Sequence, residues 1–175
     1  HPRFVMIAAP HTSNWDAVFL VAMSLAYGLR LHWMVKKSAC EGAFGWLVRR
    51  LGGVPVDRSA ARDMVAQMTA WFRSEERLAL AIAPQGTRRR VEYWKSGFYR
   101  IALAAGLPLA LGFLDYEHKV GGFGPTLVLT GDMRVDMDRV RAFYRPFRGR
   151  YPEQMTEPRL KEEVGAVDQA EQKAL

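Results

Sequence analysis

A histidine and an aspartate five positions apart, His11 and Asp16, are the residues in this sequence best suited to proton transfer. His11 follows a short apolar run that ends at Pro10, and Asp16 falls in the first turn of the helix expected next. A carboxylate beside an imidazole fixes the tautomer of the ring and stabilises the imidazolium that forms when the ring accepts a proton. Such a pair can act as a general base that removes the proton of a hydroxyl group.

The same residues also fit a purely structural role. Ser13 and Asp16 have the S-x-x-D spacing of a capping box, in which side chains satisfy free backbone N–H groups at a helix start. His11 would then be an ordinary loop histidine. On spacing alone the structural interpretation is favoured, because short motifs often match by chance.

Two further polar segments follow strand-like runs. Residues 84–88, PQGTR, come after an apolar run and combine a tight turn with a guanidinium that can grip phosphate. Residues 53–58, GVPVDR, carry Arg58 at the end of a short strand. In isolation the first segment could be a surface turn leading into a solvated basic run, and the second a surface Asp–Arg pair of little energetic value.

The elements that must position these segments alternate between strand-like and helix-like patterns. Apolar strands alternating with helices predict a single-domain α/β fold with a mostly parallel, mixed sheet flanked by helices. Strands are expected at residues 4–9, 31–35, 54–56, 78–83, 109–116 and 126–130, and helices at residues 14–29, 44–51, 61–74, 96–105 and 137–144. The last two strands, joined through Gly121-Gly122 and Gly124-Pro125, could pair as an antiparallel hairpin.

Parallel strands end at the same edge of a sheet, and active residues of such sheets lie outside that edge. Polar segments 10–16, 56–59 and 84–90 each follow a strand, so we expect them to converge on one crevice. The length of 175 residues suits one domain. We expect this domain to occupy residues 1–152, followed by a polar, acidic tail at residues 153–175 that is helical or disordered.

The chain is basic, with a formal net charge of +7. Nucleic acid, an anionic membrane and a phosphorylated small molecule would each suit a basic surface. No nucleic-acid-binding signature accompanies the charge, so no nucleic-acid partner is expected. The single cysteine, Cys40, excludes an internal disulfide, and neither His32 nor His118 has a partner at metal-ligand spacing.

Taken together and in this order, the polar segments resemble blocks of the glycerolipid acyltransferase family, which includes the lysophosphatidic acid acyltransferases. His11 and Asp16 match its H-x4-D motif, residues 53–58 match its arginine block, and residues 84–88 match its PEGTR block. The sequence WKSGF resembles its F-K-x-G block, and Leu-Pro-Leu before the next strand resembles its last block. Because several blocks occur in the right order over about two thirds of the chain, the resemblance favours catalytic over structural roles.

The resemblance implies a glycerol-3-phosphate acyltransferase-like fold and transfer of a fatty acyl group from acyl-CoA or acyl carrier protein to a lysophospholipid hydroxyl, as in 1-acylglycerol-3-phosphate. His11 would be the general base and Asp16 would orient it, with no covalent acyl-enzyme, metal or cofactor. The residues implied for the acceptor phosphate are Arg58, Gly86, Thr87, Arg88 and Lys95, and the other substrate-binding residues are Gln85 and Asn14.

One departure from the family pattern is Gln85, where the family has Glu. It motivates the alternative of a non-catalytic or altered member that binds acyl lipid or acyl carrier protein. A further alternative is a hydrolase that uses His11 and Asp16 on water. The resemblance also implies an anionic membrane surface as a partner, reached peripherally from the cytoplasmic side. Basic residues 88–90 and 139–150 and exposed aromatics such as Trp94 or Phe147 would make this contact. Residues 139–150 also fit a solvated helix face and loop.

Overall fold

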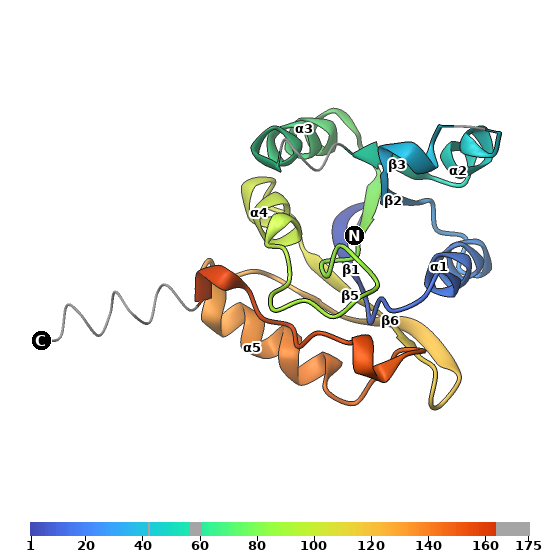
Figure 1. The fold of residues 1–175 in the computed structure, drawn as a ribbon. Coiled ribbons are helices and arrows are strands. Elements are labelled where there is room, and N and C mark those ends of the chain that lie inside the picture. The colour runs from blue at the N-terminus through green and yellow to red at the C-terminus, as the bar shows by residue number, and fades with distance from the viewer. Residues whose placement is uncertain (42, 57–60, 164–175) are drawn as a thin grey trace, which may run out of the picture.

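The computed structural model describes residues 1–41, 43–56 and 61–163, which form a six-stranded sheet between two layers of helices (Figure 1). The strands are β1 (Arg3–Ala9), β2 (Leu31–Lys36), β3 (Gly53–Val56), β4 (Leu78–Ile82), β5 (Leu109–Asp115) and β6 (Val120–Leu127). The α-helices are α1 (Trp15–Ala26), α2 (Gly45–Arg50), α3 (Ala61–Ser74), α4 (Gly97–Ala104) and α5 (Met133–Tyr144). Short 3-10 turns lie at η1 (Lys37–Ala39) and η2 (Pro152–Gln154).

The strand order is β3-β2-β4-β1-β5-β6. All neighbouring pairs are parallel except β5 and β6, which are antiparallel. This arrangement confirms the predicted α/β fold with a mostly parallel, mixed sheet. Strands β1 and β4 are neighbours, with Ile7 opposite Ile82, so the loops that follow them start side by side. These are the loops that carry His11 and Arg88.

The helices divide between the two faces of the sheet. Helices α3, α4 and α5 cover one face, and α1 and α2 lie on the other (Figure 1). None of the helices in the described part of the chain combines the length and the apolarity needed to cross a bilayer.

Large and small side chains alternate along the central strands, which makes the two faces unequal. In β4, Leu78, Leu80 and Ile82 point into the main core with α3 and α4, whereas Ala79 and Ala81 point toward α1. The smaller cluster on the α1 side consists of Met6, Leu20, Leu31, Ala79, Ala81 and Ala110. Because small residues line this face, space remains between the sheet and α1.

The predicted β5–β6 hairpin is present, but its glycines lie in strand β6 rather than in the predicted connection between the strands. Gly121 and Gly124 lie inside β6, and the turn is formed by residues 116–119. A Cβ atom on Gly124 would come within 2.2 Å of the Phe143 ring, and one on Gly121 would lie 2.7 Å from Leu114. These glycines therefore permit close packing against the strand rather than a turn.

Helix α5 begins at Met133, earlier than the predicted residue 137. Asp132 caps it, since its Oδ1 accepts hydrogen bonds from the backbone N–H groups of Arg134 at 3.0 Å and Val135 at 3.3 Å. A side-chain cap of this kind satisfies free donors at a helix start, which explains the extra turn.

Residues 153–163, expected to begin a tail, pack against the domain. Leu160 is fully buried in the main core and forms an isolated β-bridge with Trp94. The Glu163 carboxylate lies 2.7 Å from the Arg141 guanidinium. The folded domain therefore extends at least to Glu163, and residues 164–175 lie outside the described residues.

Candidate active site

The loop after β1 brings the histidine and the aspartate together at the carboxyl edge of the sheet. His11 Nδ1 lies 3.1 Å from Asp16 Oδ2. The His11 side chain is 23% exposed and that of Asp16 is 7% exposed, so the imidazole borders open space while the carboxylate lies behind it. Since Nδ1 faces the carboxylate, Nε2 is the ring nitrogen that can take a proton from a bound molecule.

Asp16 is held by further hydrogen bonds. Its Oδ2 accepts from the backbone N–H groups of Thr12 at 2.8 Å and Ser13 at 2.9 Å, and its Oδ1 accepts from the Tyr116 hydroxyl at 2.6 Å. Burial acts to raise the pKa of Asp16, but the hydrogen bonds from His11, Tyr116 and the Ser13 N–H outweigh it. The pKa of this carboxyl therefore lies below its ordinary value, and the group stays ionised at neutral pH.

The capping and catalytic interpretations of Asp16 are compatible in the structure. Ser13 Oγ accepts a hydrogen bond from the Trp15 N–H at 3.2 Å, while Asp16 accepts from the Ser13 N–H. These reciprocal contacts resemble those of a capping box at the start of α1. The same carboxylate oxygen faces His11, so the contacts that close the helix end also hold the imidazole's partner in place.

Tyr116 is a site residue that sequence reasoning missed. It lies in the turn after β5, 100 positions from Asp16, and reaches it because β5 is the neighbour of β1. Burial, and then the bond to Asp16, raise the pKa of the Tyr116 phenol, so it stays a protonated donor. No spacing or motif pointed to this residue.

The loop after β4 places Arg88 beside the histidine. An Arg88 Nη1–H donates to Asn14 Oδ1, which ties residues 84–88 to the first loop. Asn14, Arg88 and His11 line the same cavity, so the structure brings these three predicted residues together. Thr87 is half-buried in the turn, where its Oγ1 accepts from the Arg89 N–H at 3.4 Å.

Gly86 and Lys95 line a second cavity, which His11 also borders. Gly86 has a φ of +69°, a backbone conformation that favours glycine. A Cβ atom at this position would lie 2.9 Å from Lys95 Cε, so the lysine side chain lies directly over the glycine. The imidazole is therefore accessible from two cavities, with Arg88 lining one and Lys95 the other.

The structure does not bring Gln85 to this group. Gln85 is buried, and its Nε2 donates to the carbonyl oxygens of Arg89 at 2.7 Å and Gln154 at 3.1 Å. It lines neither of the cavities that His11 borders. Arg58 lies outside the described residues.

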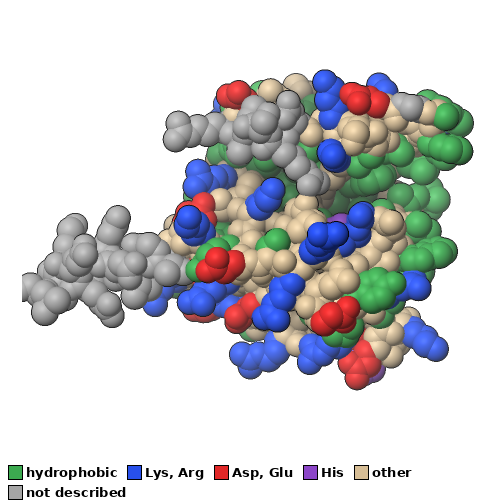
Figure 2. Space-filling view, viewed as in Figure 1, with side chains coloured by type: hydrophobic (Ala, Val, Ile, Leu, Met, Phe, Trp, Pro, Cys, Tyr) green, Lys and Arg blue, Asp and Glu red, His purple; other side chains and the backbone are tan. Residues whose placement is uncertain are grey.

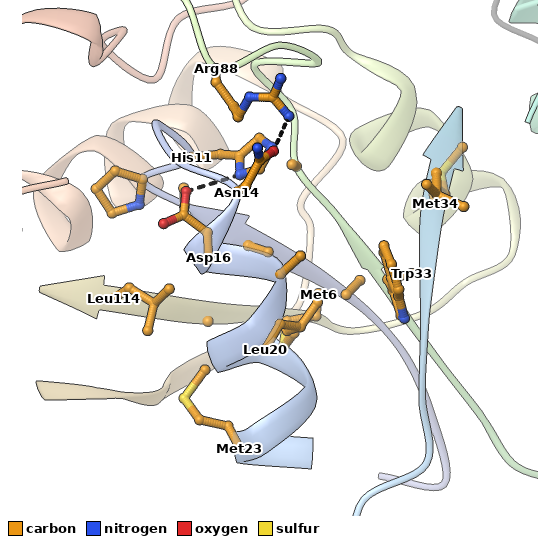
Figure 3. Close-up of a pocket in the computed structure, with 18 of the residues that line it drawn as sticks. Met6, His11, Asn14, Asp16, Leu20, Met23, Trp33, Met34, Arg88 and Leu114 are labelled. Carbon is orange, nitrogen blue, oxygen red and sulfur yellow. Dashed lines mark hydrogen bonds and ion pairs between the residues drawn. The ribbon is translucent and has the colours of Figure 1, made fainter. Parts of the chain in front are cut away.

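The cavity shared by His11 and Arg88 has a volume of about 480 Å³ and changes character along its length. Figure 3 shows His11, Asn14 and Arg88 grouped at one end, with apolar side chains such as Leu20 and Met23 of α1 farther along. Small residues of the sheet, Ala8, Ala81 and Gly112, line it as well. An elongated molecule with a charged head and a hydrocarbon chain matches this distribution.

A family model described as acyltransferase matches residues 2–110. The structure is similar to the crystal structure of the 1-acyl-sn-glycerophosphate (LPA) acyltransferase PlsC from Thermotoga maritima, with a TM-score of 0.54 and 15% sequence identity. The match covers 83% of this chain and 65% of that chain, and at this identity it shows a shared fold. A comparison with curated proteins found no match.

Proposed function

The chain belongs to the acyltransferase family, and on that premise we propose that it moves a fatty acyl group from a thioester to a lysophospholipid hydroxyl. The donor would be acyl-CoA or acyl carrier protein, and an acceptor of the expected class is 1-acylglycerol-3-phosphate. One observation carries the proposal: the His11–Asp16 pair, 3.1 Å apart, lies with Arg88 at the polar end of a largely apolar cavity.

The proposed reaction uses the imidazole as a proton carrier. His11 Nε2 takes the proton of the acceptor hydroxyl as the oxygen attacks the thioester carbonyl carbon. The new C–O bond forms, the C–S bond breaks, and the imidazolium returns the proton to the leaving thiolate. Asp16 stabilises the imidazolium while the proton is held there.

The charged groups around the imidazole suit a phosphorylated acceptor. A guanidinium can bind phosphate oxygens in a fork, which gives Arg88 this role beside His11. Lys95 offers a second positive charge from the other cavity, next to the turn at Gly86. Arg58 keeps this role only as an expectation from the family resemblance.

The apolar part of the first cavity suits a fatty acyl chain, since burial of each methylene group stabilises binding by about 0.8 kcal/mol. Lipids that carry such chains reside in bilayers. The proposal therefore includes an anionic membrane surface as a partner, with the chain acting peripherally at its cytoplasmic side.

A donor and acceptor panel tests the proposal. Purified protein is incubated with acyl-CoA or acyl carrier protein and with a set of lysophospholipids, and free thiol and lipid products are followed, the latter by mass spectrometry. We expect thiol to appear only when an acceptor is present, together with a diacyl product. Thiol release without acceptor would indicate a hydrolase, and acyl-lipid retention without turnover would indicate a binding protein.

A further inference from the structure

Exposed apolar side chains gather on the side of the molecule formed by α1 and α2, the right-hand side of Figure 2. The exposed large hydrophobic residues of this region are Trp15, Val18, Phe19, Leu25, Tyr27, Leu29, Phe44, Trp46, Leu47 and Leu51. We refer to these ten residues as the α1–α2 apolar surface. Monomeric soluble proteins rarely leave a large contiguous apolar patch exposed, so this surface indicates an interaction site.

Helix α1 carries no charged side chain on its solvent side. Its two polar residues are Asp16, which is buried in the site, and Ser24, whose hydroxyl donates to the Leu29 carbonyl. Leu20 faces the sheet, whereas Leu25 is 73% exposed. A helix that is apolar around its whole circumference is normally covered by protein or by lipid, and in this structure the outer side of α1 is uncovered.

Basic residues border the same surface. Arg30, Lys36, Lys37, Arg49 and Arg50 are all exposed. Within residues 15–41 and 43–51, Glu41 is the one exposed acidic residue. A second copy of the chain would bring positive charge against positive charge, whereas anionic lipid headgroups complement it, each basic residue contributing about 1 kcal/mol near such a surface.

The cavity at His11 extends between the two helices that carry this surface. Leu20 and Met23 of α1 line it on one side, and Val48 of α2 with Lys36 lines it on the other. Figure 2 shows the molecular surface hollowed between these two groups of hydrophobic side chains. A lipid that left a bilayer beneath this surface could therefore reach His11 along an apolar path.

We propose that the α1–α2 apolar surface is a membrane-docking face that inserts its aromatic side chains into an anionic lipid layer. The surface differs from the one expected from the sequence, because Trp94 is buried and Phe147 stacks on Phe113 with ring centroids 4.2 Å apart. The identity of the lipid that enters the cavity rests on the proposed function, but the docking itself requires no turnover.

Flotation with vesicles tests the docking face directly. The wild type and the double variant Phe44→Ser/Trp46→Ser are mixed with vesicles of equimolar phosphatidylcholine and phosphatidylglycerol. The control Val128→Ser/Val135→Ser removes exposed apolar side chains from another part of the surface. We expect the first variant to lose at least about tenfold in vesicle partitioning, from the apolar area it no longer buries, and the control to bind like the wild type.

A second arm of the experiment tests the basic residues that border the α1–α2 apolar surface. Arg30→Gln/Arg50→Gln should abolish the preference for vesicles with phosphatidylglycerol over pure phosphatidylcholine, and added salt should have the same effect on the wild type. If Phe44→Ser/Trp46→Ser unfolds, as judged by circular dichroism, Leu25→Ser takes its place, because Leu25 is the most exposed of the large hydrophobic residues in α1.

The outcomes separate docking from catalysis. Wild-type partitioning by the Phe44→Ser/Trp46→Ser variant overturns the proposal, and so does sedimentation showing that the surface instead holds two copies of the chain together. Thiol release with a micellar, short-chain acceptor is measured in parallel, and it should persist in the docking variant. A wild type that binds vesicles but transfers no acyl group would remove the proposed function and leave the docking face in place.

Discussion

Asp16 is contacted by backbone N–H groups, an imidazole and a phenol, and each contact can be removed separately. The backbone N–H groups of Thr12 and Ser13 tie the carboxylate to the loop before α1, while His11 and Tyr116 connect it to the site. At the scale of single residues, the contacts with backbone N–H groups should affect stability, and the contacts with His11 and Tyr116 should affect turnover.

Asp16→Asn should fold and turn over slowly. An asparagine oxygen can still accept from the N–H groups at the helix start, because Asn is a good capping residue. It cannot stabilise the imidazolium by charge, so we expect kcat to fall on the order of 10²- to 10⁴-fold. Circular dichroism and steady-state kinetics check the two parts, and a variant as fast as the wild type would contradict the role given to the carboxylate.

Asp16→Asn should also reduce the loss in the free energy of unfolding that the protein shows at acidic pH. The pKa of Asp16 is lowered in the folded state, so the stability it contributes is present above its unfolded value of 3.8. That contribution is lost as the pH falls through the lower, folded pKa. Urea unfolding between neutral pH and pH values below 3.8 should therefore show a smaller acid loss in Asp16→Asn than in the wild type.

Tyr116→Phe removes one hydrogen bond to a charged group without removing the ring. A bond of this kind is worth about 1.5–3 kcal/mol, part of which is lost from the positioning of Asp16. We expect kcat to fall by roughly tenfold while the acceptor KM stays unchanged. Tyr151→Phe is the control, since Tyr151 is exposed and its ring lies under Arg150 rather than at Asp16. Equal kcat values for the two variants would remove Tyr116 from the site.

Gln85→Glu, which restores the family residue, should destabilise this chain. The amide of Gln85 donates to two backbone carbonyls, and a carboxylate at this buried position has no hydrogen to donate. Buried acceptors left without a donor cost about 1–3 kcal/mol each. Urea unfolding should show the loss for Gln85→Glu and none for Gln67→Glu, whose side chain is exposed on α3. Equal stabilities would contradict the structural role of the amide.

The His11–Asp16 pair could be predicted because its two members lie five positions apart and match a motif of the family. Tyr116 reaches Asp16 across 100 positions, and only the order of the strands brings it there. The contact of Gln85 with Gln154 was equally out of reach, because it depends on a carbonyl of the segment that follows α5.

At the scale of elements, the alternation of side-chain size along the strands creates the cavity. Ala81 of β4 lines it where a larger residue would fill it. Ala81→Leu should shift the preferred acyl donor to shorter chains, and overpacking should cost at most about 1–3 kcal/mol of stability. A chain-length series of acyl-CoA donors checks this, with Ala70→Leu on the exposed side of α3 as control. An unchanged chain-length preference would place the acyl chain elsewhere.

The element boundaries that the sequence predicted well include those of the strands with continuous apolar runs. Strands β1 and β4 begin and end within a residue of the predicted ranges. The predicted range of strand β6 is wrong because its glycines resemble those of a turn. In the structure these glycines leave room for the rings and side chains that pack against the strand. The sequence predicts a tail at residues 153–163 because this segment is mostly polar. It packs against the domain through single buried residues such as Leu160.

At the scale of the whole molecule, the two sides of the sheet differ in how they are covered. The main core packs under α3, α4 and α5, while the α1 side has a small cluster, the cavity and the apolar surface. The family match ends at residue 110, and β6 and α5 complete the sheet and the core beyond it. The edge of the sheet that carries His11 thus lies next to the side of the molecule proposed to meet lipid.

The central claim, that His11 is the general base of an acyl transfer, is tested most directly by comparing two histidine variants. His118 forms a similar pair with Asp115 at 2.6 Å, but its side chain is 67% exposed and lies outside the cavities that His11 borders. Acceptor-dependent thiol release should fall on the order of 10²- to 10⁴-fold in His11→Ala and stay unchanged in His118→Ala, with both variants folded. A His11→Ala protein that transfers acyl groups at the wild-type rate would contradict the account.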